Sequence, residues 1–231
     1  MVDIKRRAVL IVIIIIFIAG LAVLFYPRAT QWYSSRQQDI AVRKYFEEVK
    51  SLEENQVSER LSNAQKYNAM LSDYGYKGDN EFNRNDYSNY SNALSIEGDN
   101  IICIVEIPKI NVRLPVYSGT ADEDLQKGAG HIEGTSLPVG GLGTHCAISA
   151  HRGLPYSVMF RDLDKLAEGD EFYIYTLGSK LTYTVDNISV VLPDDIGNLA
   201  IEEDKDYLTL ITCTPYAVNT HRLLVRGVRS E

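Results

Sequence analysis

The segment LTLITCTPYAVNTHRLLVRGVR, residues 208–229, contains a cysteine and an arginine whose placement suggests acyl-transfer chemistry. Two apolar stretches flank a loop from Thr214 to His221. If these stretches pair as a hairpin, Cys213 and Arg222 meet at the loop ends of the two strands. The nucleophile of a cysteine enzyme is the thiolate, and arginine stays charged and can donate to an oxyanion. The pattern therefore predicts a nucleophilic Cys213 that acts beside Arg222.

Such an enzyme also needs a proton carrier, most often a histidine, and the chain has four. His151 directly follows the apolar strand CAIS and stands at its end, where catalytic groups are disproportionately found. His131 lies in a predicted loop, AGHIEGTS, and His145 opens a strand. His221 would face away from Arg222 if the strand has begun there. We therefore favour His151, and we expect structural hydrogen bonds or solvated loops for the others.

The three cysteines, Cys103, Cys146 and Cys213, leave at least one free thiol because their number is odd. A Cys103–Cys146 disulfide is one possibility, and two small buried hydrophobic side chains are the simpler one. Taken alone, Cys213 could equally be a buried core thiol. A metal site made by His145, Cys146 and His151 is a weaker alternative, since adjacent strand residues face opposite ways and no fourth ligand is evident. We expect no cofactor and no required metal.

The composition indicates a globular protein and argues against nucleic-acid binding. The chain has 231 residues, of which 45% are hydrophobic and 23% charged, as in ordinary globular proteins. Its formal net charge is -8, and Lys and Arg do not form a basic stripe. Nucleic-acid binding needs clustered cations, so we expect no nucleic-acid partner.

An unbroken apolar run from Ala8 to Tyr26 predicts a membrane helix, because about 20 apolar residues span the hydrocarbon core. A removable signal peptide is the alternative, but the run is long for one and no convincing cleavage site follows. The basic residues 5–7 should stay in the cytoplasm, which places the chain after Trp32 outside the cell. Trp32 and Tyr33 suit the aromatic belt at the outer interface.

Three regions are expected along the chain: residues 1–33 as cytoplasmic tip and anchor, 34–98 as a helical stalk with a loop, and 99–231 as a β-domain. In the stalk, apolar residues from Ile40 to Met70 approximate a helical period, which predicts one or two amphipathic helices. The segment from Asp73 to Asp99 is rich in Asn, Asp, Ser, Gly and Tyr and predicts a long loop, either a cover over the site or a linker.

The carboxyl-terminal region alternates short apolar stretches with turn residues, which predicts a mainly β domain, an antiparallel or mixed barrel or sandwich. Gly178-Ser179 marks a hairpin turn. The predicted strands are Ile101–Glu106, Arg113–Tyr117, His145–Ser149, Glu171–Tyr175, Leu181–Val185, Ser189–Leu192, Leu208–Thr212 and Leu223–Val228.

The segment TLITCTPYAVNTHRLLVRG resembles the signature of the sortase family, Thr-Leu-x-Thr-Cys followed by an Arg nine positions after the Cys. The Thr-Pro-Tyr after the Cys and the run NTHRLLVRG are similar to class C, the pilin-polymerising branch. Three more stretches agree, Ile107–Thr120, Gly128–Pro138 and His151–Tyr175, so the resemblance extends from about Ile101 to Arg229.

The resemblance implies an eight-stranded sortase-type β-barrel with amino-terminal helices, in an enzyme on the outer face of a Gram-positive cell. It implies Cys213 as the nucleophile, His151 as the acid/base partner and Arg222 as the group that binds the oxyanion or orients the substrate. The implied reaction cleaves an LPXTG-like sorting signal through a thioacyl enzyme and transfers it to an amine. In class C that amine is a pilin Lys. A housekeeping sortase that uses cell-wall peptide, or an inactive scaffold that binds sorting signals, are the alternatives.

Class C sortases often place an Asp-Pro-aromatic lid over the site. The corresponding stretch here, Gly78 to Phe82, contains no Pro. The candidates to cover Cys213 are Phe82, Tyr87 and Tyr90.

Overall fold

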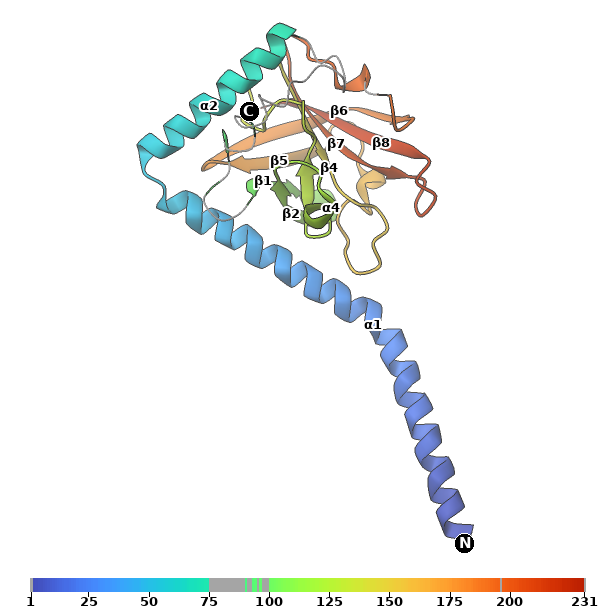
Figure 1. The fold of residues 1–231 in the computed structure, drawn as a ribbon. Helices are drawn as coiled ribbons and strands as arrows, with labels where there is room; N and C mark the ends of the chain where they lie inside the picture. Colours follow the sequence, from blue (N-terminus) through green and yellow to red (C-terminus); the bar gives the residue numbers. More distant parts are fainter. Residues whose placement is uncertain are drawn as a thin grey trace.

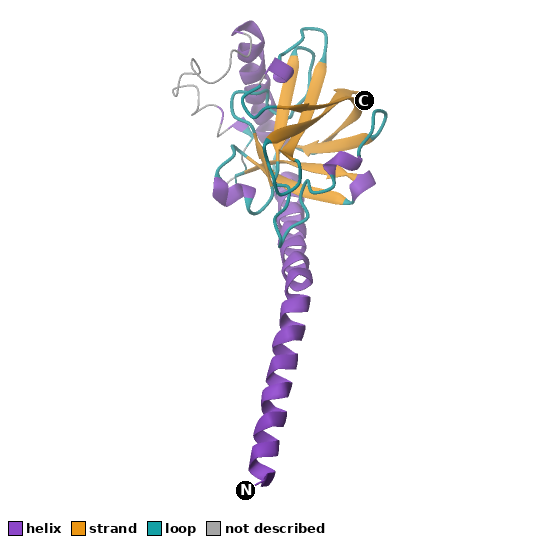
Figure 2. Ribbon diagram, turned by 90° about the vertical axis from the view of Figure 1, so that its right-hand side faces the viewer, coloured by secondary structure: helices purple, strands orange, loops and turns teal. Residues whose placement is uncertain are grey.

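The computed structural model describes residues 2–74, 90, 93, 94, 96, 100–195 and 197–230. Two long helices precede a closed barrel of eight strands. The barrel lies at one end of the molecule, and the first helix projects far beyond it (Figure 1 and Figure 2). Most of the expected loop between Asp73 and Asp99 lies outside the described residues.

Helix α1 runs without interruption over Val2–Ser51, and helix α2 over Glu54–Tyr74. The most apolar stretch of α1 has a mean hydropathy of 3.4 and none of it is buried, so the helix is long and apolar enough to cross a membrane. Pro27 lies inside α1. A proline removes a backbone hydrogen bond and bends a helix, and Figure 1 shows α1 bending between its free amino-terminal part and the part beside the barrel.

The barrel closes in the order β1-β2-β3-β4-β7-β8-β6-β5, as expected for a mainly β domain. The β2–β3 and β4–β7 pairs are parallel and the others antiparallel. The strands are β1 Ile101–Ile107, β2 Val112–Tyr117, β3 Ala129–His131, β4 Thr144–Ser149, β5 Glu171–Thr176, β6 Ser179–Val191, β7 Asp206–Thr214 and β8 His221–Arg229. Short helical turns lie between them: η1 Pro108–Ile110, α4 Asp122–Leu125, η2 Leu163–Lys165 and η3 Gly197–Leu199.

Two strand predictions were wrong in detail. The stretches Leu181–Val185 and Ser189–Leu192 belong to one strand, β6, whose register against β8 shifts between Val185 and Asn187. Such a bulge disturbs the alternation of apolar and polar residues, which made one strand look like two. Strand β3 was expected as a loop, because three residues next to glycines carry no strand pattern.

The hairpin between β5 and β6 turns one residue earlier than predicted. Thr176 pairs with Ser179, so Leu177 and Gly178 form a two-residue turn with φ values of 45° and 83°. Positive φ at both central residues is the geometry that suits tight hairpins, and glycine adopts it without strain.

Most of β4 and β7, and residues 223–225 of β8, are buried on both faces. Ile148, Leu210 and Val225 belong to the main core, whereas alternate residues on the same strands form a second cluster with Leu199. The segment between β6 and β7 supplies Leu199 and covers the outside of the barrel there. This double burial explains why the three strands read as continuous apolar stretches.

Buried polar side chains attach both helices to the barrel. The Tyr45 side chain on α1 is 1% exposed. Its hydroxyl donates to the Ile102 carbonyl at 3.2 Å and accepts from the Leu177 amide at 3.1 Å. Asn68 on α2 donates to the Leu137 carbonyl at 3.0 Å and accepts from the Leu137 amide at 2.7 Å. Each helix therefore has a fixed position against the strands.

We predict that Tyr45→Phe lowers the free energy of unfolding by about 1–3 kcal/mol, because it leaves a buried amide and a buried carbonyl without their partner. Thermal unfolding of the full chain in detergent measures the change. Tyr33→Phe is the matched control, since Tyr33 on the same helix is 61% exposed. Equal unfolding temperatures for the two variants would contradict the role of Tyr45.

Candidate active site

The registers of β4, β7 and β8 bring the three predicted site residues into one row. Cys213 pairs directly with Arg222 across β7 and β8. Ser149 pairs with Ile211 across the parallel strands β4 and β7. The Ala150 amide donates to the Ile211 carbonyl at 3.1 Å, which continues this pairing past the end of β4. Continuing this offset by two residues, past the end of β4 and along β7, brings His151 beside Cys213.

The side chains of Cys213 and Arg222 share the outer face of the barrel. Side chains two residues apart on a strand point the same way, so Cys213 follows Ile211 and Arg222 follows Leu224. Ile211 and Leu224 belong to the outer cluster with Ala147 and Leu199. The row of His151, Cys213 and Arg222 therefore lies where the apolar cover on this face ends.

Exposure separates Cys213 from the other two cysteines. Cys103 and Cys146 are 0% and 3% exposed, and Cys213 is partly exposed. All three thiols are free, so the alternative of a Cys103–Cys146 disulfide is not realised. Burial raises the pKa of Cys103 and of Cys146, which keeps both as thiols. Cys213 is not the core thiol that its residue type alone suggested.

His131 is a structural histidine, and it lies in β3 rather than in the expected loop. Its Nε2 donates to the Ser136 carbonyl at 2.8 Å, so its Nδ1 accepts from the Tyr90 hydroxyl at 2.6 Å. Burial lowers the pKa of His131 to about 4. The ring is fully buried, and its partner in the β3–β4 ladder, Ile148, belongs to the main core. His131 is therefore neutral and faces away from the row of Cys213.

His145 is the second residue of β4, which begins one residue earlier than predicted, and both of its ring nitrogens form hydrogen bonds. Nδ1 donates to the Ala200 carbonyl at 2.9 Å, and Nε2 accepts from the Thr209 hydroxyl at 2.7 Å. Burial lowers the pKa of His145. These bonds attach the segment between β6 and β7 to the sheet. Among the residues that the structure describes, no group of three or more His, Cys, Asp or Glu could hold a metal ion.

His221 begins β8 opposite Thr214, and its Nδ1 lies 3.0 Å from the Thr220 hydroxyl. Adjacent strand residues face opposite ways, so His221 is turned away from the face that carries Arg222. Of the four histidines, only His151 stands beside the partly exposed thiol.

The Arg222 guanidinium is held by its own loop. Nη1 donates to the Asn219 carbonyl at 3.3 Å and to the His221 carbonyl at 3.1 Å. Within the described part of the chain, no carboxylate forms an ion pair with Arg222. Its charge is therefore available to an anion near Cys213.

Arg152 was not predicted from the sequence as part of the site. Its side chain is 7% exposed and donates to the Thr214 hydroxyl at 3.0 Å. Arg152 and Thr214 directly follow the predicted site residues His151 and Cys213. The sequence did offer a signal for Arg152, because it is a charged residue directly after the candidate histidine His151.

Tyr90, one candidate to cover Cys213, has a different role. It is 3% exposed, and its hydroxyl bonds His131 and accepts from the Gly119 amide at 3.1 Å. The other two candidates, Phe82 and Tyr87, lie outside the described residues, as does the stretch Gly78 to Phe82.

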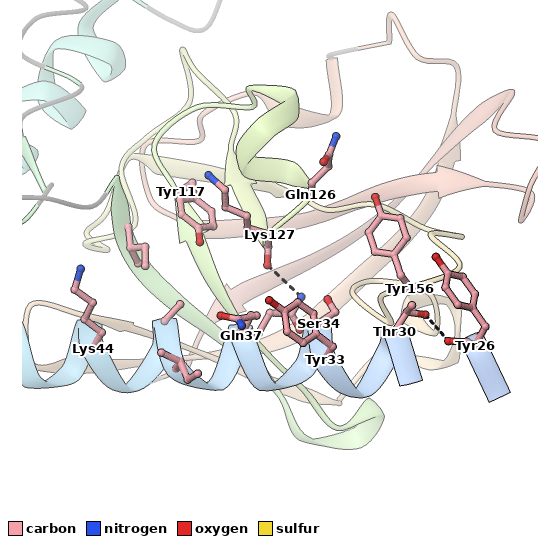
Figure 3. Close-up of a pocket in the computed structure, with 14 residues that line it drawn as sticks. Tyr26, Thr30, Tyr33, Ser34, Gln37, Lys44, Tyr117, Gln126, Lys127 and Tyr156 are labelled. Carbon is pink, nitrogen blue, oxygen red and sulfur yellow. Dashed lines mark hydrogen bonds between the residues drawn. The ribbon is translucent and has the colours of Figure 1, made fainter. Parts of the chain in front are cut away.

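A separate hollow of about 600 Å³ lies between α1 and the barrel (Figure 3). None of His151, Cys213 and Arg222 borders it. On the barrel side it is closed by Ile101, Tyr117, Gln126, Lys127 and Tyr156. Gln38 of α1 donates to the Lys127 carbonyl at 3.1 Å and holds the two sides together. The hollow therefore belongs to the attachment of the stalk.

We predict that acid weakens the fold through His131. In the unfolded chain this histidine takes up a proton near pH 6.5, but in the folded chain only near pH 4, so unfolding binds a proton between these values. The stability that His131 contributes is complete above pH 6.5 and is lost as the pH falls. Going from pH 7 to pH 5 removes about 2 kcal/mol of unfolding free energy through this residue.

Urea unfolding at the two pH values measures this loss. In His131→Gln the pH dependence should shrink by this amount. Identical pH dependence in the wild type and in His131→Gln would contradict a buried, neutral His131.

Comparison with known proteins agrees with this geometry. A family model described as the sortase domain matches residues 105–230. A crystal structure of sortase C1 from Streptococcus agalactiae superposes with a TM-score of 0.79 and 44% identity, covering 83% of this chain and 98% of that one.

Two relatives match by sequence. Sortase A of Bacillus anthracis is 26% identical over 223 residues, covering 96% of this chain and 95% of the relative. Sortase D of Bacillus subtilis is 32% identical over 114 residues, which span 49% of this chain and 54% of the relative. The chain belongs to the sortase family, and among sortases it is most like class C.

Proposed function

We propose that this chain is a membrane-anchored cysteine transpeptidase. It cleaves an LPXTG-like sorting signal and transfers the acyl fragment, which ends in the threonine carbonyl, to an amine, a pilin lysine. The observation that carries the proposal is the row of His151, Cys213 and Arg222 on three neighbouring chain segments of the outer face. A partly exposed thiol between an imidazole and a guanidinium that forms no ion pair with the described residues suits acyl transfer better than it suits a structural role.

In the first half-reaction, Cys213 Sγ attacks the carbonyl carbon of the signal's threonine, and a C–S bond forms. The carbonyl oxygen becomes an oxyanion, to which Arg222 donates. When the intermediate collapses, the C–N bond to glycine breaks. His151 gives a proton to the leaving amine, and a thioester on Cys213 remains.

In the second half-reaction, an incoming amine attacks the thioester carbonyl and loses a proton to His151. The C–S bond breaks and a new amide forms. Cys213 and His151 together regain the proton they began with, so the enzyme returns to its starting state. His151 thus serves as the acid in the first half-reaction and as the base in the second.

The choice of a pilin lysine as acceptor rests on the class C likeness. The solved structure of sortase C1 of GBS pilus island 1 superposes on this chain with a TM-score of 0.75 and 41% identity, covering 84% of this chain. The alternative is a housekeeping sortase, which would attach the signal to a cell-wall amine.

For the whole chain we propose residues 1–33 as cytoplasmic tip and single membrane span, 34–98 as stalk and loop, and 99–231 as the extracellular catalytic domain. The exposed apolar part of α1 supports the span, and the basic residues 5–7 support a cytoplasmic amino terminus. Because α1 continues without a break into the part that contacts the barrel, the catalytic domain would stand close to the membrane.

Transfer itself is the direct test. We expect the full chain in detergent, given an LPXTG-containing peptide, to form a thioester on Cys213 and then an amide with a peptide that carries the pilin lysine. Mass spectrometry identifies both species. A peptidoglycan-like amine supplied in competition decides between the two acceptors, and a preference for it would refute the pilin assignment. Failure to form the thioester would refute the enzyme.

We predict that Cys213→Ala abolishes transfer, because the nucleophile has no substitute. Arg222→Lys should lower kcat/KM by about 100-fold or more, because a point charge does not replace a planar fork of donors at an oxyanion. Arg113→Lys on β2, where Arg113 lies 3.8 Å from Glu106, is the matched control and should keep normal turnover. Residual cleavage by Cys213→Ala would overturn the mechanism, and normal turnover by Arg222→Lys would make that arginine structural.

A further inference from the structure

We infer that Arg152 is a positioning residue, which holds His151 beside Cys213 through a hydrogen bond to Thr214 on the opposite side of the sheet. The inference rests on the proposed function. It concerns the pair of residues that directly follow His151 and Cys213.

The need for such a contact arises from where β4 ends. Strand β4 ends at Ser149, and the Ala150 amide makes the last backbone hydrogen bond to β7, at 3.1 Å from the Ile211 carbonyl. His151 therefore stands beyond the backbone ladder, while Cys213 still lies within β7. A general acid must stay within hydrogen-bond reach of the atoms it serves, so something else must keep the two chain segments in register.

Side-chain contacts continue the pairing after the ladder ends. The Thr212 hydroxyl donates to the Ala150 carbonyl at 2.8 Å. Two residues further along both segments, Arg152 Nη1 donates to the Thr214 hydroxyl oxygen at 3.0 Å. Thr214 follows Cys213 within β7 and therefore faces the other way, so the contact of Arg152 with Thr214 lies behind Cys213.

The Arg152 guanidinium is itself fixed from two further directions. Nε donates to the Arg161 carbonyl at 3.0 Å, and Nη2 lies 2.7 Å from Asp164 Oδ2. The Phe160 amide donates to the His151 carbonyl at 3.2 Å, so the same segment also holds the histidine backbone. A planar fork with donors in three directions meets these partners at once, which a lysine ammonium on a flexible stem cannot do.

The chain turns sharply just after Arg152. Gly153 has a φ of +102°, and a Cβ there would lie 3.3 Å from the Tyr216 ring. Tyr216 comes from the loop between β7 and β8, so the segments that follow β4 and β7 remain in contact up to this turn. Arg152 is the residue directly before this turn.

The test compares variants of the full chain in the transfer assay. Arg152→Lys should lower kcat by about 10- to 100-fold with little change in KM, since small displacements of a catalytic group have effects of this size. Thr214→Val keeps the shape of the side chain, removes only the acceptor and should lower kcat by a smaller factor. Arg161→Lys is the matched control, because it keeps the backbone carbonyl that Arg152 uses and should behave as wild type.

The double variant tests the coupling directly. If the two residues act through one hydrogen bond, Arg152→Lys with Thr214→Val should be no slower than Arg152→Lys alone. Fully multiplicative losses would overturn the inference. So would wild-type kcat in either single variant.

A second readout is independent of turnover. The rate at which iodoacetamide alkylates Cys213 should follow a pH profile set by the Cys213–His151 pair, and this profile should shift in Arg152→Lys and Thr214→Val but not in Arg161→Lys. Thermal unfolding identifies variants that are merely unstable. Lower stability with an unchanged alkylation profile would show a structural role only and overturn the inference. If the wild type alkylates normally but does not transfer, the proposed function fails, and the alkylation profiles still decide the role of Arg152.

Discussion

The parallel pairing of β4 with β7 is the constraint on which the candidate site depends. The strand β7 is the middle of the three segments, with β4 on one side and β8 on the other. Its register against β8 places Arg222 opposite Cys213, and its register against β4, continued past Ser149, leads to His151 on the other side. A shift of one residue in either pairing would turn a side chain to the opposite face of the barrel. The site therefore exists only as long as both registers hold.

Burial secures these registers. The three strands pack apolar side chains against the main core on one face and against the cluster that contains Leu199 on the other. A slip would expose apolar residues on both faces at once, which is a large free-energy cost. The cover ends at Cys213, so a strand whose first seven residues are buried presents a partly exposed thiol near its end. The same packing that stabilises the barrel thus distinguishes this cysteine from Cys103 and Cys146.

The four histidines show how position decides chemistry within one residue type. His131 and His145 each have both ring nitrogens bonded and a pKa that burial lowers, so they stabilise connections between segments. His131 accepts a hydrogen bond from the Tyr90 hydroxyl. His145 holds the segment that covers the outer cluster. His151 lies beyond the end of β4 and is partly exposed beside the thiol.

Much of this protein was predictable from sequence, because its determinants are local. The apolar run after Lys5 to Arg7 predicts a helix that can span a membrane, and Cys213 and Arg222 flank a short loop, so simple hairpin pairing brings them together. The extent of β6 and the existence of β3 were not predictable, since a bulge disturbs the pattern of one and the other is three residues long. The pairing of β4 with β7, the burial of His131 and the contact of Arg152 with Thr214 were decided only in the folded chain. Each joins residues far apart in the sequence, and no local pattern encodes which distant strands become neighbours or in what register.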